Sequence, residues 1–208
     1  PENVRPPEIL EMTVDYLMAE ILPITTHPFH EVYNFIADRT RCVRQDLTLQ
    51  GCKDEDATVH VLEKICRFHI LSHHRLCGQV EVFDEKLNFE MLDNTFITLF
   101  ATYEVRRQLQ ISSAHEAEFT AFYMIRFASP HDRNRLLAGL PRELLRSKEM
   151  KFSRLVLSTM DWPLLNYAKF FELVRKAPFL VACMMETKFG FLRPRALAIM
   201  NFAMGVPR

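Results

Sequence analysis

Residues 30–48, with the sequence HEVYNFIADRTRCVRQDLT, show the pattern from which the fold class follows. The apolar residues of this stretch recur every three or four positions, as on one face of an α-helix. They are Val32, Phe35, Ile36, Val43 and Leu47. No glycine or proline interrupts the stretch, and Gly51 follows where a left-handed residue can end a helix at little cost. The stretch therefore predicts an amphipathic helix that packs against other helices.

Glycines and prolines mark the expected ends and starts of further helices in both directions along the chain. Five glycines each follow a run that has helical spacing, and prolines stand where the next run begins, a position that tolerates the missing N–H group. The glycines are Gly51, Gly78, Gly139, Gly190 and Gly205, and the prolines are Pro6-Pro7, Pro130, Pro141, Pro163, Pro178 and Pro194. Ser113-x-x-Glu116 has the pattern of a capping box, and Ser129-x-x-Asp132 resembles one.

These signals predict an all-α chain without β-strands. The expected helices cover 6–22, 30–48, 54–77, 84–110, 113–128, 131–138, 141–157, 163–176, 178–189 and 193–204. Residues 79–84 alternate briefly in polarity but are expected to form a loop. Short loops between helices favour an array of antiparallel helical hairpins, or α-solenoid. We expect a single helical-repeat domain over 1–208, with a sub-boundary near 129–141.

Composition indicates a folded intracellular protein with an uneven charge. Lysine plus arginine and aspartate plus glutamate both total 26, yet residues 141–208 carry a net charge of +7 and residues 1–140 one of −7. The five scattered cysteines favour a reducing compartment. We find no signal peptide, and the apolar run Phe179–Met185 is too short to cross a bilayer. The ends of the sequence suggest a piece of a longer protein.

One helix face carries four side chains of the kinds that bind metals: Cys66, His69, His73 and Cys77. The two cysteines lie about 16 Å apart along a helix, too far to share one ion. His69 and His73 could chelate together, but no third ligand is evident in the sequence. We therefore favour a packed helix face, and keep a metal-dependent enzyme as the less favoured alternative.

The charged residues of the first stretch fall on different sides of its helix. At about 100° per residue, Arg39 and Asp46 are expected in the middle of the apolar stripe, where each would pair with a neighbouring helix. Arg41 and Arg44 are expected to face away, as surface charge or as contacts to a partner or phosphate.

A second basic group occupies the last third of the chain. Its members that could contact a partner or RNA are Arg142, Arg146, Lys151, Arg175, Lys176, Lys188, Arg193 and Arg195. Such spread charge can follow a phosphate backbone or meet an acidic partner, and ordinary solvated charge is the alternative interpretation. Phosphate-binding glycine loops and the common hydrolase motifs are missing, so we predict no enzyme activity and no cofactor.

Several motifs resemble one known family in their order along the chain. The segment Tyr33-Asn-Phe-Ile-Ala-Asp-Arg-Thr-Arg-Cys-Val-Arg-Gln-Asp-Leu-Thr-Leu-Gln50 resembles the hallmark of the Sac/GANP family of messenger-RNA export scaffolds. Arg5-Pro-Pro-x-Ile-Leu10 precedes it, and Glu63-Lys-x-x-Arg-Phe-His69, Phe83-Asp-x-Lys-x-Asn88, Glu116-Ala-Glu-Phe119 and Phe170-Phe-x-Leu-Val174 follow it in the family's order. The chain looks most similar to the GANP branch, which includes the insect Xmas protein.

This resemblance implies helical hairpins packed like tetratricopeptide and PCI-type repeats, ahead of a winged helix that the sequence does not include. It also implies a role in nuclear mRNA export. The expected partners are a PCI-domain protein with its small acidic Sem/Dss-type subunit, messenger RNA and nuclear pore components. The expected location is the nucleus and nuclear envelope, with a cytoplasmic pool. The alternative is a PCI-like interaction module without an RNA role, such as a short family member at centrosomes or spindles.

Overall fold

The computed structural model describes residues 4–51, 56–127, 137–161 and 165–205, which are helices and connecting turns without a β-strand. The all-α prediction is therefore confirmed for this part of the chain. The chain divides into two compact units, Pro1–Ala114 and His115–Arg208. The sub-boundary expected near 129–141 falls inside the second unit and partly on residues that the structure does not describe.

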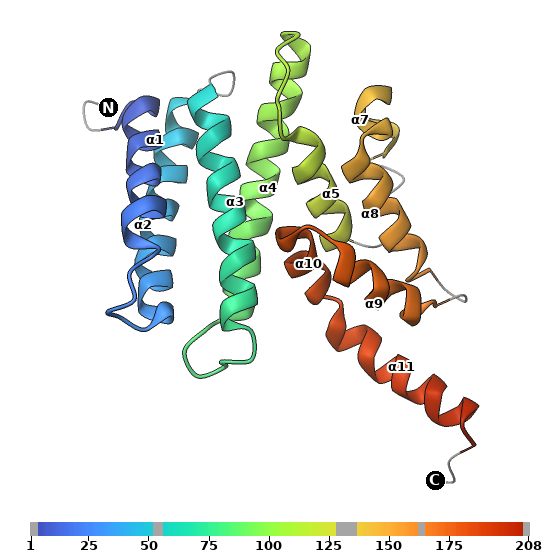
Figure 1. Cartoon of the computed structure of the whole chain (residues 1–208). Helices are drawn as coiled ribbons and strands as arrows, with labels where there is room; N and C mark the ends of the chain where they lie inside the picture. Colours follow the sequence, from blue (N-terminus) through green and yellow to red (C-terminus); the bar gives the residue numbers. More distant parts are fainter. Residues whose placement is uncertain (1–3, 52–55, 128–136, 162–164, 206–208) are drawn as a thin grey trace. The chain divides into compact units, whose positions relative to one another are not determined.

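Unit 1 consists of long helices that run alternately up and down (Figure 1). They are α1 (Pro7–Tyr16), its π-helical continuation η1 (Leu17–Ile21), α2 (Phe29–Gln50), α3 (Asp56–Leu76) and α4 (Glu85–Gln108). The amide of Leu22 donates to the carbonyl of Leu17 at 2.9 Å, so the end of the first predicted helix is a wide turn. The loop expected at 79–84 is confirmed.

One core cluster of unit 1 gathers side chains from η1, α2, α3 and the loop before α4. Buried together are Leu17, Val32, Tyr33, Ile36, Phe68, Leu76 and Phe83. Tyr33 lies at the centre, stacked on Phe68 with ring centroids 5.8 Å apart and meeting the edge of Phe83 at 5.1 Å. Burial also raises the pKa of Tyr33 to about 12. These contacts hold the second helix against the third and close the loop between α3 and α4.

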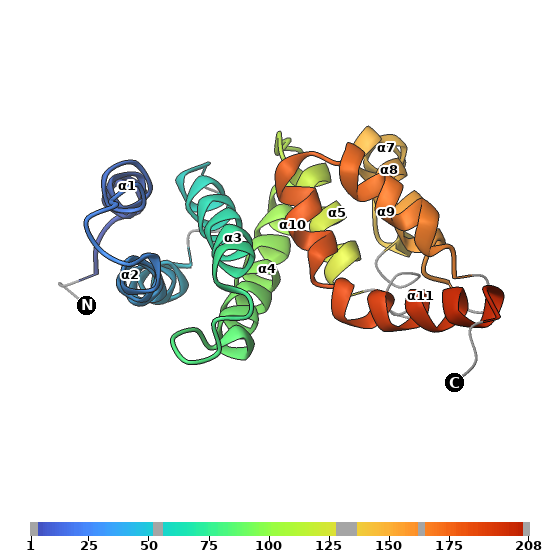
Figure 2. The ribbon, with the colours of Figure 1, turned by 60° about the horizontal axis from the view of Figure 1, so that its bottom comes forward.

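Unit 2 is made of shorter helices (Figures 1 and 2). They are α5 (Glu116–Arg126), α7 (Arg142–Arg146), α8 (Lys148–Ser158), α9 (Tyr167–Lys176), α10 (Phe179–Glu186) and α11 (Phe189–Ala203). One cluster buries Ala121, Met124, Met150 and Leu157 between α5 and α8. Phe171 and Phe189, with ring centroids 5.4 Å apart, join α9 to the start of α11.

Helix starts follow proline in several places, as predicted. Pro6, Pro141 and Pro178 are the residues just before α1, α7 and α10. Gly51, Gly78 and Gly205 have φ angles of 69°, 85° and 62°, which confirms their left-handed conformation at helix ends. Pro130, Pro163 and the pattern Ser129-x-x-Asp132 lie outside the described residues.

Four local predictions are wrong. The expected helix 141–157 breaks at Ser147, whose hydroxyl caps α8 by accepting from the amide of Met150 at 3.3 Å. Pro194 and Gly190 both lie within α11 rather than at a start and an end. Ser113 does not cap α5, because its hydroxyl accepts from the Nε of Arg106 at 3.1 Å and the helix begins at Glu116.

Candidate functional site

Arg39 lies at the surface, which corrects the prediction that it is buried in the apolar stripe of α2. Its side chain is 53% exposed, pairs with the adjacent Asp38 at 2.5 Å and lies over the ring of Phe35. The buried residues of α2 are Val32, Tyr33, Ile36, Thr40, Val43 and Leu47. Their mean direction is about 70° away from Arg39, at 100° per residue. The prediction counted Phe35 as part of the buried stripe, whereas Phe35 is half exposed.

Asp46 is half-buried and pairs with a residue of the segment before α1, whereas the prediction was a partner on a neighbouring helix. Its Oδ2 accepts a hydrogen bond from Nε of Arg5 at 2.8 Å. Gln50, one turn further along α2, donates from Nε2 to the carbonyl of Arg5 at 2.7 Å. The two bonds fasten the segment before α1 to the end of α2, so Asp46 has a structural contact in this chain.

Arg41 and Arg44 differ from each other, although both were expected to face away. Arg41 is exposed. Arg44 is half-buried, and its Nη2 donates to Sδ of Met91 on α4 at 3.0 Å. Burial lowers the pKa of Arg44 below its usual range, and the charge of Arg41 adds to that effect. The prediction of an exposed pair is therefore wrong for Arg44.

The Cys66, His69, His73 face of α3 is packed in the interior, as we favoured. All three residues are at least 95% buried, whereas Cys77 is only half-buried. Nδ1 of His69 lies 2.8 Å from Oδ1 of Asn88, and Nδ2 of Asn88 donates to the carbonyl of His69. Burial lowers the pKa of His69 to about 4 and raises that of the Cys66 thiol well above its usual range. At neutral pH the imidazole is uncharged and the thiol protonated.

The described residues contain no group of three or more histidine, cysteine, aspartate or glutamate side chains placed to hold a metal ion. Nor does any helix among them combine the length and apolar character that crossing a membrane requires. The two buried histidines of α3 lie against other side chains of unit 1. His69 contacts Asn88, and Glu85 lies 3.7 Å from His73.

Unit 2 carries the remaining predicted contact residues on several helices. Arg142 and Arg146 of α7, Lys151 of α8, and Arg175 and Lys176 of α9 are exposed. Lys176 donates to Glu172 at 2.6 Å, and Lys169 reaches the same carboxylate at 3.0 Å. The hydrogen bonds from Lys176 and then from Lys169 lower the pKa of Glu172 to about 2. Lys176 is thus partly neutralised within its helix.

The three basic residues at α11 differ in their contacts: Lys188 bonds to another helix, whereas Arg193 and Arg195 lie at the surface. Nζ of Lys188, just before the helix, donates to the carbonyl of Arg126 at 2.8 Å and ties α11 to the end of α5. Arg193 and Arg195 are exposed and lie over the rings of Phe189 and Phe191, at 4.5 and 3.5 Å from the ring centroids. The structure therefore presents two guanidinium groups together with aromatic surface.

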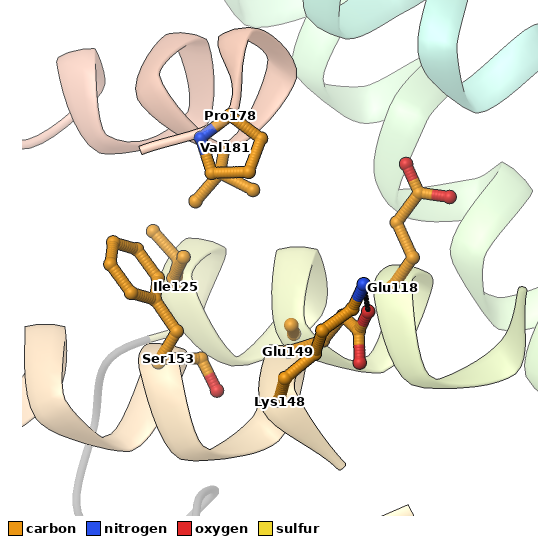
Figure 3. Close-up of a pocket in the computed structure, with 9 residues that line it drawn as sticks. Glu118, Ile125, Lys148, Glu149, Ser153, Pro178 and Val181 are labelled. Carbon is orange, nitrogen blue, oxygen red and sulfur yellow. Dashed lines mark ion pairs between the residues drawn. The ribbon is translucent and has the colours of Figure 1, made fainter. Parts of the chain in front are cut away.

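An apolar cleft in unit 2 was missed by the sequence reasoning. It lies between α5, α8 and α10 and encloses about 250 Å³. In Figure 3, Ile125 lies on one side and Pro178 and Val181 on the other. An ion pair between Lys148 and Glu149, at 3.7 Å, lies at its edge. No periodicity within one helix could reveal this cleft, because three separate helices line it.

By its architecture, the described part of the chain belongs to the class of all-α proteins with packing like that of helical repeats. The sequence comparison then identifies the family. A model of the SAC3/GANP family matches residues 1–208, and the chain belongs to that family.

Three relatives show the same relationship. The chain is 32% identical over 95% of its length to SAC3 family protein B of Arabidopsis thaliana, and 32% identical over 98% to SAC3 family protein 1 of Schizosaccharomyces pombe. It is 31% identical over its whole length to protein xmas of Drosophila melanogaster. The matched regions make up 12%, 21% and 10% of these relatives, so the chain spans a small part of each.

Proposed function

We propose that this chain is part of a scaffold subunit in nuclear, transcription-coupled mRNA export. In this role it docks a PCI-domain protein that holds a small acidic Sem/Dss-type subunit, contributes to RNA binding, and acts at nuclear pores and the nuclear envelope with a cytoplasmic pool. The observation that carries the proposal is the match to the SAC3/GANP family along residues 1–208. The motifs that resemble those of the export scaffolds lie within these residues.

The surface of unit 2 supports a contribution to RNA binding. Arg193 and Arg195 are exposed, and each lies over a phenylalanine ring of α11. Guanidinium groups attract phosphates, and aromatic faces stack on unpaired bases. The exposed lysines and arginines of α7, α8 and α9 add positive charge within the same unit. Such a surface binds single-stranded RNA with a strong dependence on salt.

The interior supports a binding role over catalysis. The buried His69 and Cys66 are uncharged at neutral pH, because burial moves both pKa values away from the charged form. A general base or a nucleophile needs a pKa near the working pH and access to a substrate. His69 and Cys66 therefore contribute to packing in the proposed function, and the chain would act through its surfaces without a small-molecule substrate.

A second candidate is a protein-interaction module without an RNA role. The apolar cleft of α5, α8 and α10 favours it, because buried apolar anchors carry much of the binding energy in protein complexes. The bonds of Lys176 to Glu172 and of Lys188 to the Arg126 carbonyl favour it as well, since they use part of the basic group inside the chain.

The two candidates differ in their response to charge reversal. In the assembled complex, Arg193→Glu with Arg195→Glu should weaken binding of a single-stranded RNA oligonucleotide at least about tenfold. The measurement is fluorescence anisotropy at low and at moderate salt. If the variant binds the RNA as tightly as the unchanged complex does at both salt concentrations, the RNA role is contradicted and the interaction module remains.

Purification of the complex tests the scaffold itself. We expect the chain, isolated from nuclear extract, to bring with it a PCI-domain protein and a small acidic subunit identified by mass spectrometry. Isolation without either of them, under conditions that preserve other nuclear complexes, would contradict the proposed assembly.

A further inference from the structure

A groove on unit 1 lies between α2 and α4 and encloses about 640 Å³. Most of its lining residues are of polar types, and they include Arg41, Arg44, Asp46, Leu49, Met91 and Asn94. We refer to these residues as the Arg44 groove. The α2 residues of this set belong to the segment that resembles the family's hallmark, whereas the α4 residues come from more than 40 positions further along the sequence.

Arg44 is a charged side chain without a compensating anion in the described part of the chain. Its Nη2 reaches only the uncharged sulfur of Met91, and its Nε is buried with no hydrogen-bond partner. The inner neighbours that act on it, Cys66 and His69, are a protonated thiol and a neutral imidazole at neutral pH. A half-buried guanidinium in such surroundings costs free energy until a carboxylate or phosphate approaches it.

Arg41 increases that cost. It is exposed at the groove, its positive charge repels that of Arg44, and it forms no ion pair with the described residues. The other two arginines near this end of unit 1 are different, since Arg5 pairs with Asp46 and Arg39 with Asp38. Arg41 and Arg44 therefore line one groove without an ion-pair partner among the described residues, and the carboxylate of Asp46 in that groove is paired with Arg5.

We propose that the Arg44 groove binds the carboxylate side chain of an acidic segment in a protein partner. Arg44 would donate to the carboxylate from inside the groove, and Arg41 from its edge, in the charge-assisted manner that guanidinium groups favour. Leu49, which is 70% exposed, and Met91 offer apolar contact to the residue next to that carboxylate. The partner segment is thus an acidic side chain beside an aliphatic one.

The lining favours a protein segment over RNA. Asp46 places a negative charge in the groove, which repels a polyanion more than it repels one carboxylate. Among the described residues that line the groove none is aromatic, so bases have no ring on which to stack. The inference rests on the proposed function only in that the chain docks proteins; it is independent of Arg193, Arg195 and the RNA surface.

Selection from a phage-displayed library of random dodecapeptides tests the ligand chemistry on the whole chain. We expect enrichment of aspartate or glutamate beside leucine, isoleucine or valine. A selected peptide should bind Arg44→Gln about tenfold more weakly, the loss typical of one charge-assisted hydrogen bond. Arg39→Gln is the matched control, because Arg39 is on the same helix but pairs with Asp38.

A second variant tests whether a loss of peptide affinity could come from a loss of folding. Asn94 is exposed in the groove, one turn beyond Met91 on α4. Asn94→Asp places a carboxylate there with almost no change of shape, and should raise the midpoint of thermal unfolding while lowering peptide affinity. These opposite signs separate the proposal from general damage, which would lower both.

Three outcomes would overturn the proposal. They are a selection without acidic enrichment, an equal loss of affinity in Arg39→Gln, and an RNA oligonucleotide whose binding depends on Arg44 while that of the acidic peptides does not. The last outcome would assign the groove to phosphate. Failure of the Arg193 and Arg195 test alone leaves this groove intact, so the two proposals can fail separately.

Discussion

The two units use their charged side chains differently. Three ion pairs of unit 1 join separate segments: Arg5 with Asp46, Lys64 with Asp15, and Arg106 with Asp56. In unit 2, Glu172 pairs with Lys169 and Lys176 of its own helix, and Arg193 and Arg195 lie exposed over neighbouring rings. The three pairs of unit 1 join segments that are far apart in the sequence, whereas these charges of unit 2 lie on single helices. The same residue types thus connect segments in one unit and lie along one helix in the other.

The largest effect should come from breaking the contact at the end of α4. Arg106 is 4% exposed and donates to Asp56 at 2.6 Å and to Ser113 at 3.1 Å. Arg106→Ala should lower the free energy of unfolding by about 3 kcal/mol, because it removes a buried side chain together with its bonds to Asp56, to Ser113 and to the carbonyl of Ser112. Urea denaturation followed by circular dichroism measures it. The next residue is the control: Arg107 pairs with Glu104 inside α4, so Arg107→Ala should cost less than about 1 kcal/mol.

Acid should weaken unit 1 through His69. Its folded pKa of about 4 lies below the unfolded value of 6.5, so the unfolded state takes up the proton first as pH falls. Stability is complete above pH 6.5 and is lost toward pH 4, with about 2 kcal/mol gone at pH 5. His69→Gln should make the dependence shallower in urea denaturation at pH 7 and pH 5. The exposed His74 provides the control, and a His74→Gln variant with the same flattening would contradict this assignment.

A smaller effect should separate pairs between segments from pairs within a helix. Asp46→Asn removes the charge that holds Arg5 and should lower the free energy of unfolding by about 1 kcal/mol. Asp38→Asn removes the charge beside Arg39, whose side chain is 53% exposed, and should change stability by only a few tenths at most, ~0.3 kcal/mol. Thermal melts of both variants measure the difference, and equal shifts would remove this distinction between the two kinds of pair.

The smallest effect on stability is expected in unit 2. Arg193→Glu with Arg195→Glu should leave the free energy of unfolding within about 0.5 kcal/mol, because both side chains are exposed. The same variant is the one expected to weaken RNA binding. A large loss of stability in differential scanning calorimetry would show that these arginines support the fold, and would remove the contrast with unit 1.

The fold class followed from the sequence because its signals are local. Helical spacing, prolines at starts and left-handed glycines act within a few residues, and they located most of the helices. Local ambiguity explains the errors: Ser147 can sit inside a helix or cap one, and only the packing of α8 on α5 selects the cap. Pro194 likewise carries no mark that distinguishes a first turn from an interior one.

The surfaces were harder to predict because they depend on which face is buried. Tyr33, Thr40 and Leu47 of α2 turn the buried face away from Arg39 and toward Arg44. That rotation is decided by α3 and α4, which the pattern of α2 alone does not contain. For the same reason, the cleft of unit 2 and the contact of Arg44 with Met91 could not be read from spacing within one helix.

The helical turn between Gly190 and Pro194 lacks one of the backbone hydrogen bonds of α11. Proline has no amide hydrogen, so the helical bond from residue 194 to the carbonyl of Gly190 is missing, and glycine resists bending less than other residues. The first part of α11 is anchored by Phe189 against Phe170 and Phe171. The part beyond Pro194, with Leu197 and Phe202 exposed, is thus joined to this anchored start through a turn that lacks one helical hydrogen bond.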